Sequence, residues 1–213
     1  MSVEANTVER SSMEASDIFR VKGYVVLPGM IDPALADFLW SYVHTKFASM
    51  LLTSQDRQVP HTPAAYGDPA FDGLLEYLRP QIEQRSSVAL YPTYSYFRLY
   101  KRGDVLKRHR DRPACEISIS LNLGQTPDDP WPIYVEKDGE PYRALLSPGD
   151  ALLYRGIDCF HWREAYAGTR LVQVFLHYVD RNGPHANQKF DGRQSLMRPK
   201  QHDAADGNQS RDL

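Results

Sequence analysis

The spacing of apolar residues changes along the chain, from a helical period in the first part to alternation after about residue 91. A short apolar run at Tyr24–Leu27 predicts a strand. Asp32 and Pro33 then suit the N-cap and first position of a helix, and the apolar residues that follow have helical spacing: Leu35, Phe38, Leu39, Tyr42 and Val43. A second helix is predicted over Pro69–Gln84, with one apolar stripe formed by Phe71, Leu74, Leu75 and Leu78.

The second part of the chain has the two-residue period of strands. One side of the first predicted strand carries Tyr94, Tyr96, Arg98 and Tyr100, and apolar residues alternate with polar ones over Ile117–Asn122. Further strands are predicted at Leu145–Leu146, Ala151–Tyr154 and Leu171–Tyr178, separated by turns such as Ser147-Pro148-Gly149-Asp150. Short strands without intervening helices predict a mainly β fold, a sandwich or barrel supported by N-terminal helices.

These patterns divide the chain into one domain with two polar ends. The predicted domain covers residues 17–182, with a helical support at 30–85 and a β-core at 91–180. Residues 1–16 form a polar N-terminal segment, and residues 183–213 form a polar tail or flap.

Composition excludes several classes of protein. The 25 Lys and Arg residues nearly balance the 27 Asp and Glu residues, and they form no basic stripe, which argues against a nucleic-acid partner. No apolar run is long enough to span a membrane, and the polar N-terminus is unlike a secretory signal. The cysteines, Cys115 and Cys159, are too few for a disulfide framework, so we expect a reducing, cytoplasmic setting.

His109 and Asp111 are the first candidates for chemistry. In an extended segment, residues i and i+2 point to the same side, so this imidazole and carboxylate would converge on one small volume, as two ligands of one metal ion do. His161 follows the predicted strand Ala151–Tyr154 and supplies a third ligand. Two imidazoles and one carboxylate leave coordination positions open, the arrangement associated with non-haem Fe(II) that binds a co-substrate and dioxygen.

Arg170 adds a second element to this site. It opens the last predicted strand after Gly168-Thr169, and its guanidinium offers a fork that matches a carboxylate and keeps its charge when buried. A metal triad together with an inward arginine predicts a keto-acid with two carboxylates as co-substrate.

With these residues in place, the chain resembles the Fe(II)- and 2-oxoglutarate-dependent oxygenases, in particular their prolyl-4-hydroxylase-like branch. The similarity runs from about Tyr91 to Asp180 and rests on five pieces in order: Tyr100-Lys101-Arg102-Gly103, His109-Arg110-Asp111, Ser147-Pro148-Gly149-Asp150, His161, and Gly168-Thr169-Arg170. The resemblance implies a double-stranded β-helix, or jelly roll. It also implies that His109, Asp111 and His161 hold Fe(II) and that Arg170 binds the distal carboxylate of 2-oxoglutarate.

The same resemblance implies the reaction. The co-substrates would be 2-oxoglutarate and O2, the products succinate and CO2, and ascorbate would be a stimulant. We expect hydroxylation of a C–H bond of a small molecule or amino-acid derivative. A protein or peptidyl (prolyl-type) hydroxylase is one alternative. A non-catalytic, cupin-like protein that binds metal or 2-oxoglutarate is another, and a zinc hydrolase with the same three ligands is a third.

The chain departs from the branch at three places. Leu106 and Ser120 stand where a tyrosine is usual, and Pro130-Trp131-Pro132-Ile133-Tyr134 replaces a Gly-Gly segment. We therefore expect the Ser118 or Ser120 hydroxyl to assist Arg170 in place of a tyrosine hydroxyl. Because of these departures, the resemblance does not imply that the substrate is peptidyl proline.

Alternation extends the predicted pocket beyond the ligands. If Arg170 points inward, Val172, Val174 and Leu176 share its face and His177 points away. If Tyr100 points inward as a co-substrate contact, Tyr96 and Arg98 do too, so Arg98 would bind a substrate carboxylate or phosphate or pair with Glu116. Trp131 and Trp162 are further candidate substrate contacts.

Overall fold

The structure is a computed structural model that describes residues 14–54, 56–126 and 130–198. The predicted N-terminal segment therefore lies mostly outside the described residues, as does the last part of the predicted tail.

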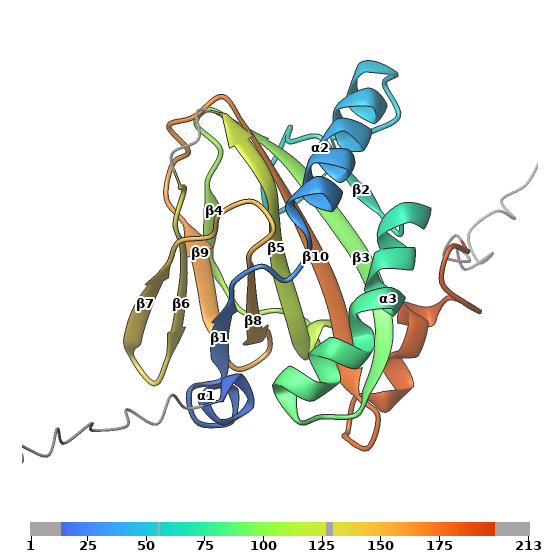
Figure 1. The fold of residues 1–213 in the computed structure, drawn as a ribbon, viewed down its shortest axis with the longest axis vertical. Helices are drawn as coiled ribbons and strands as arrows, with labels where there is room; N and C mark the ends of the chain where they lie inside the picture. Colours follow the sequence, from blue (N-terminus) through green and yellow to red (C-terminus); the bar gives the residue numbers. More distant parts are fainter. Residues whose placement is uncertain (1–13, 55, 127–129, 199–213) are drawn as a thin grey trace, which may run out of the picture.

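All but one of the predicted helices and strands occur in the predicted order, and the structure adds one helix before the first strand, a short strand between the two long helices and further strands in the second half (Figure 1). The helices are α1 (Ala15–Lys22), α2 (Pro33–Ala48) and α3 (Pro69–Ser86), with short 3₁₀ segments η1 (Pro113–Cys115) and η2 (Ala186–Gly192). The strands are β1 (Tyr24–Leu27), β2 (Ala64–Tyr66), β3 (Leu90–Lys101), β4 (Leu106–His109), β5 (Ile117–Thr126), β6 (Ile133–Lys137), β7 (Glu140–Ala144), β8 (Ala151–Arg155), β9 (Phe160–Arg163) and β10 (Arg170–Asp180).

Two antiparallel sheets make the body of the molecule. The major sheet has the order β1-β8-β5-β10-β3-β2, and the minor sheet has the order β4-β9-β6-β7. In Figure 1 the minor sheet lies on the left, the helices α2 and α3 lie on the right, and the major sheet lies between them. The mainly β, jelly-roll fold class predicted from the sequence is confirmed.

Both long helices begin as their sequences predict. Asp32 caps α2 by accepting a hydrogen bond from the amide of Ala34 (2.8 Å), and Asp68 caps α3 by accepting one from Ala70 (3.0 Å). A proline follows each cap at the first helical position, where its missing N–H costs nothing. The buried faces of the helices then form one apolar core with the outer face of the major sheet.

The two faces of β10 have different neighbours, and this determines which of its residues can line the space between the sheets. Val172, Val174, Leu176 and Tyr178 belong to the core under the helices. The alternate residues, among them Phe175 and His177, face the space between the two sheets. The expectation that His177 points away from the site is therefore wrong, because the helix-covered face is the one that carries Val172, Val174 and Leu176.

The chain after β10, predicted as a polar tail or flap, is packed against the domain as far as Met197. Arg193 forms an ion pair with Asp72 of α3 (2.8 Å) with both side chains fully buried, and it also donates to the carbonyl of Thr93 (2.9 Å). Asp191 accepts two hydrogen bonds from Arg112 (2.6 and 2.8 Å). Asp72, Asp191 and Arg193 are buried, and each of them has a charged partner from a distant part of the chain.

Smaller differences concern the middle of the chain. The expected strand at Leu145–Leu146 is absent, since β7 ends at Ala144. His161 belongs to strand β9, which the sequence pattern did not predict. Both cysteines are buried free thiols. Within the described residues, no helix is long and apolar enough to cross a membrane.

Candidate active site

Three predicted ligands meet at one point between the sheets. One ligand atom each from His109, Asp111 and His161 lies within 4.8 Å of the others. The Nε2 atoms of both histidines lie 3.6 Å from the same oxygen, Oδ1 of Asp111. The side chains are 20%, 11% and 3% exposed for His109, Asp111 and His161, so one side of the cluster opens to solvent and the other is buried.

Strand pairing brings these residues together. His109 ends β4 and is the direct partner of His161 on β9, so the two imidazoles lie side by side with ring centroids 4.2 Å apart. Asp111 follows β4 by two residues, and its amide donates a hydrogen bond to the carbonyl of Gly156 (2.9 Å). The extended backbone thus places His109 and Asp111 on the same side, and the pairing of β4 with β9 brings His161 next to them.

Both imidazoles are held in the orientation that a metal ligand needs. His109 Nδ1 lies 2.8 Å from the carbonyl oxygen of Lys107, and His161 Nδ1 lies 3.2 Å from that of Cys159. A carbonyl only accepts hydrogen bonds, so Nδ1 carries the proton in each ring. The lone pair of each Nε2 is then free to point at a shared ion, an arrangement that fixes both ring and tautomer in metal sites.

Asp111 is ionised at neutral pH although it is largely buried. Burial raises its pKa, but the imidazoles of His161 and His109 lower it by more, so that the pKa lies well below its ordinary value. Its Oδ2 atom is buried and has no hydrogen-bond partner. A buried carboxylate oxygen without a donor is costly, and a cation bound beside it removes that cost.

Asp111 also lies near Cys115 and His177, a second group that could hold a metal ion. The donor chemistry disfavours this group. Burial raises the pKa of the Cys115 thiol far above its ordinary value, and its sulfur lies 3.0 Å from the Tyr94 hydroxyl. His177 Nδ1 already pairs with Ser118 Oγ (2.8 Å), and burial lowers the pKa of His177 to about 4. The residues that fit an ion are therefore His109, Asp111 and His161.

A cavity of about 550 Å³ opens in front of these three residues. Tyr96 and Arg98 line it, as the alternation of β3 predicts. Asp56, Arg57, Gln58 and Tyr66 also line it, and they belong to the segment 55–66 that the sequence suggests as a groove wall or cap of the pocket. Sequence reasoning missed its other walls, which are Tyr94, Leu106, Arg112, Tyr154, Phe175 and His177. For Tyr94, on the same side of β3 as Tyr96, the alternation itself was a sufficient signal. Phe175 and His177 lie on β10, whose inward face was predicted as the opposite one, and the others lie in loops or on strands for which no inward face was predicted.

Arg98 is a buried cation in the cavity wall, and its partner differs from the expected Glu116. Its Nε donates to Oδ2 of Asp56, one Nη donates to Gln58 (2.6 Å) and the other to the hydroxyl of Tyr100 (3.3 Å). Tyr96 also donates to Asp56 (2.8 Å). The charge of Arg98 is thus already balanced by a carboxylate.

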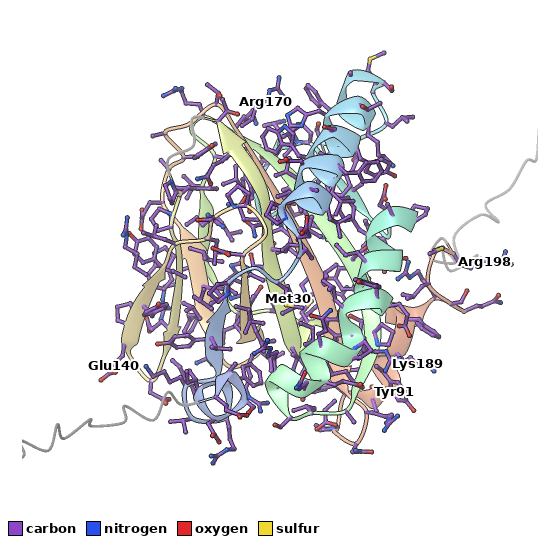
Figure 2. All side chains as sticks on the ribbon, in the orientation of Figure 1. Met30, Tyr91, Glu140, Arg170, Lys189 and Arg198 are labelled. Carbon is purple, nitrogen blue, oxygen red and sulfur yellow. The ribbon has the colours of Figure 1, made fainter. Side chains whose placement is uncertain are left out.

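Arg170 is not part of the site, which corrects the prediction that it anchors the co-substrate. It is exposed at the start of β10, on the face that α2 covers, and its guanidinium carbon lies 4.8 Å from the ring centre of Phe47. Figure 2 shows its label at the upper end of the molecule beside α2. The sequence correctly predicts that Arg170 and Val172 lie on the same face of the strand. That face is the one covered by the helices, so Arg170 lies outside the space between the sheets.

The predicted tryptophan contacts also need correction. Trp162 is on the outer face of β9, stacked on Tyr134 with ring centroids 5.2 Å apart, and its indole donates to Glu164 (3.2 Å). Trp131 is buried against Tyr100 (5.0 Å between centroids) behind the cavity wall. Neither ring lines the cavity.

The two predicted serines differ in their surroundings. The Ser118 hydroxyl is engaged, since it donates to the Cys115 carbonyl (3.1 Å) and pairs with His177. Ser120 Oγ is buried and has no partner. Tyr100 is fully buried, and its hydroxyl accepts the hydrogen bond from Arg98.

Arg163 is the largest fully buried side chain among the described residues, and sequence reasoning missed it. It follows His161 by two residues on β9 and therefore points to the same side of the strand. Its Nη atoms donate to the carbonyl of Trp131 (2.6 Å) and to Oε1 of Gln173 (2.8 Å). Burial lowers the pKa of Arg163 to about 10. The two-residue spacing from His161 was the available signal.

Comparison with known proteins bears on the fold. No family model and no curated protein matches the chain. Among solved structures, a Pseudomonas putida prolyl-4-hydroxylase aligns with a TM-score of 0.65 at 18% identity, over 78% of this chain and 97% of that one. The chain has the fold of the 2-oxoglutarate-dependent oxygenases.

Other structures with this fold differ in what they act on. The non-heme alpha ketoglutarate dependent epimerase SnoN from nogalamycin biosynthesis has a TM-score of 0.65 at 13% identity, over 78% of this chain and 81% of that one. A prolyl hydroxylase from Trichoplax adhaerens, in complex with a hypoxia inducible factor peptide fragment, has a TM-score of 0.62 at 12% identity, over 78% and 88%. At these identities the comparison supports the architecture, and the chemistry rests on the residues of this chain.

Proposed function

We propose that this protein is an Fe(II)- and 2-oxoglutarate-dependent oxygenase that hydroxylates a C–H bond of a small molecule. The observation that carries the proposal is the convergence of two Nε2 atoms on one oxygen of Asp111, with both Nδ1 atoms occupied by carbonyls. Two imidazoles and one carboxylate on one face are the donor set of non-haem Fe(II) sites with open positions.

Each residue of the chain then has a defined task. His109 Nε2, His161 Nε2 and the carboxylate of Asp111 would hold the ion. When bound, the iron with 2-oxoglutarate and O2 supplies the oxidation: one oxygen atom enters the substrate and the other enters succinate, with loss of CO2. Tyr154 and Phe175 line the inner part of the cavity, where they keep bulk water from the reacting atoms.

The shape of the cavity supports a small substrate. Its volume of about 550 Å³ is typical of pockets for small molecules. Asp56, Arg57 and Gln58 form one part of its wall, and Arg112, which is tied to Asp191 of the C-terminal segment, forms another. Residues from both segments thus line one pocket, and we infer from its volume that it takes a small molecule.

Turnover of 2-oxoglutarate tests the proposal. The protein is incubated with Fe(II), ascorbate, O2 and 2-oxoglutarate, with and without a panel of small molecules, and succinate is measured. We expect succinate that depends on Fe(II), increases with a substrate that gains one oxygen atom by mass, and disappears in His161→Ala. His44→Ala is the matched control because His44 lies on α2, where its ring packs on Trp40 (4.2 Å between centroids).

Three results would contradict the proposal. Binding of metal and 2-oxoglutarate without any succinate indicates a non-catalytic binding protein. Hydrolysis supported by Zn(II) without 2-oxoglutarate indicates a hydrolase. Oxidation of peptides but of no small molecule assigns the protein to the peptidyl hydroxylases.

A further inference from the structure

A second cavity, of about 410 Å³, lies at the start of β3, where the C-terminal segment (residues 181–198) packs against this strand. The residues that line it come from α3, β3 and the C-terminal segment, and none of them lines the active-site cavity. Figure 2 shows two of them, Tyr91 and Lys189, at the lower right of the molecule. The volume is within the range of pockets that bind small molecules.

One part of the second cavity is apolar. Its apolar side chains are Leu90, Tyr91, Pro92, Phe190 and Leu196. The rings of Tyr91 and Phe190 both lie against the ammonium group of Lys189, with their centroids 4.6 and 4.8 Å from Nζ. These side chains would remove the hydrocarbon or aromatic body of a ligand from water, which favours its binding.

The other part of the second cavity carries two cations that no described carboxylate balances. Arg79 is paired, since its guanidinium lies 3.1 Å from the carboxylate of Glu76 and 3.3 Å from that of Glu83. Arg181 and Lys189 form no ion pair with any described carboxylate. The wall of the cavity therefore attracts an anion.

The backbone beside the second cavity is strained at two residues that connect it with the active-site cavity. Phe190 and Asp191 have positive φ angles (60° and 54°), a conformation that is unfavourable for residues other than glycine. Phe190 lines the second cavity. The carboxylate of Asp191 accepts hydrogen bonds from Arg112 (2.6 and 2.8 Å) and from Tyr66 (2.6 Å), which both line the active-site cavity. A ligand in the second cavity would therefore touch one half of a strained pair whose other half holds the wall of the first.

We propose that the second cavity binds a small organic anion with an apolar body, and that this ligand stabilises the segment that holds Arg112 in the wall of the active-site cavity. The anionic group pairs with Arg181 and Lys189, and the apolar body lies against Tyr91 and Phe190. A ligand that favours this backbone conformation also favours the position of Arg112, so ligands in the two cavities change each other's affinity by the same factor. Binding at the second cavity is independent of the proposed function, whereas an effect on turnover rests on it.

Calorimetric titration of the full chain with two matched probes tests the binding site. Naphthalene-2-carboxylate carries an anionic group on an aromatic body, and naphthalene-2-carboxamide has nearly the same shape without the charge. We expect the carboxylate to bind at least about tenfold more tightly, and this ratio to fall below about threefold in the double variant Arg181→Gln/Lys189→Gln. Both side chains are exposed, so the variant should fold. Arg143→Gln, at another exposed arginine on β7, is the matched control and should bind both probes as the wild type does.

A different variant detects binding of the probes in the active-site cavity. Arg57 lines that cavity and not the second one. If Arg57→Gln loses affinity for naphthalene-2-carboxylate and the double variant keeps it, the proposal is wrong. Equal affinity of the wild type for the two probes, or no binding of either, would also contradict it.

Hydrogen exchange measured by NMR tests the connection between the cavities without any measurement of catalysis. Bound naphthalene-2-carboxylate should slow amide exchange in residues 186–197 and also at Cys115, whose amide donates to the carbonyl of Arg112 (2.9 Å). In Arg112→Gln the first effect should remain and the second should disappear, because the ion pair with Asp191 is lost. Slower exchange confined to residues 186–197 in the wild type would contradict the connection.

Formation of succinate distinguishes a failure of this proposal from a failure of the proposed function. If the protein makes succinate but binds neither probe, the second cavity is not a site for organic anions and the proposed function stands. If the probes bind as expected but no succinate forms, the second site stands and the proposed function is wrong.

Discussion

The backbone of Gly156 lies directly against the carboxylate of Asp111. The amide of Asp111 donates to the Gly156 carbonyl (2.9 Å), and a Cβ atom on Gly156 would lie 2.5 Å from Asp111 Oδ2 and 2.2 Å from the carbonyl oxygen of Cys115. Any side chain here would displace the carboxylate or the backbone that holds it.

Gly156→Ala should therefore weaken the metal site. We expect Ni(II) affinity to fall by at least about tenfold, because a ligand moved by a few tenths of an ångström no longer meets the other two, and stability to fall by about 1–3 kcal/mol from overpacking. Calorimetric titration and urea unfolding measure the two effects. Gly73→Ala on α3 is the control: its new Cβ would meet nothing closer than 3.8 Å, so metal affinity should stay unchanged. Equal behaviour of both variants would contradict the role of Gly156.

Asp111→Asn should remove the stabilisation that a metal ion gives to the fold. A divalent ion at a hundredfold excess over its dissociation constant stabilises the wild-type protein by about 2.7 kcal/mol, and thermal unfolding with and without Ni(II) detects this gain. Without the negative charge the gain should vanish, because two imidazoles alone bind the ion weakly. Asp37→Asn, an exposed position on α2, should keep the full gain. A metal-dependent rise in Asp111→Asn similar to wild type would exclude Asp111 as a ligand.

Arg193→Met should destabilise the whole domain, although Arg193 lies in the polar C-terminal region. The change leaves the carboxylate of Asp72 buried without its counter-charge, which costs about 3–5 kcal/mol. Urea unfolding measures the loss. Arg20→Met is the comparison, since the ion pair of Arg20 with Asp17 is largely exposed and should contribute less than about 1 kcal/mol. A loss below 1 kcal/mol for Arg193→Met would mean that the C-terminal segment is not part of the folded unit.

The ion pair of Asp56 with Arg98 should make stability depend on acid pH. Burial raises the pKa of Asp56, but the hydrogen bond and charge of Arg98 lower it by more, so its pKa in the folded protein is below the unfolded value of about 3.9. A carboxylate with a depressed pKa contributes its full stabilisation above the unfolded pKa, and the contribution is lost as the pH falls through the folded pKa.

Comparison of wild type with Asp56→Asn from pH 7 to pH 3 checks this dependence. The difference in unfolding free energy should be constant down to about pH 4 and then shrink as Asp56 becomes protonated. Asp17→Asn, at the exposed pair, should show a difference below about 1 kcal/mol throughout. If the difference in unfolding free energy between wild type and Asp56→Asn grows toward acid pH, the pKa of Asp56 is not lowered by folding and the prediction is wrong.

Part of this site could be predicted because it depends on residues that are close to one another in the sequence. His109 and Asp111 share a side because the backbone is extended between them, and Tyr96 and Arg98 enter the cavity wall for the same reason. The beginnings of α2 and α3 follow from an aspartate before a proline. Each of these predictions depends on neighbours within a few residues, which is the range over which a sequence pattern acts.

The error at Arg170 has a different origin. Alternation in β10 correctly separates Val172 and Val174 from Gln173 and Phe175, but it leaves open which set faces the site. The helices decide this, because α2 and α3 cover the face that carries the valines.

The sequence by itself thus determined the mainly β fold with helical support, the helix starts and the pairing of His109 with Asp111, since periodicity and capping are local properties of the chain. Only the tertiary structure decided that His161 lies opposite His109, that Arg163 rather than Arg170 lies between the sheets, and that Arg193 is buried against Asp72. These relationships depend on which strands pair and which face the helices cover, and no local pattern records that choice.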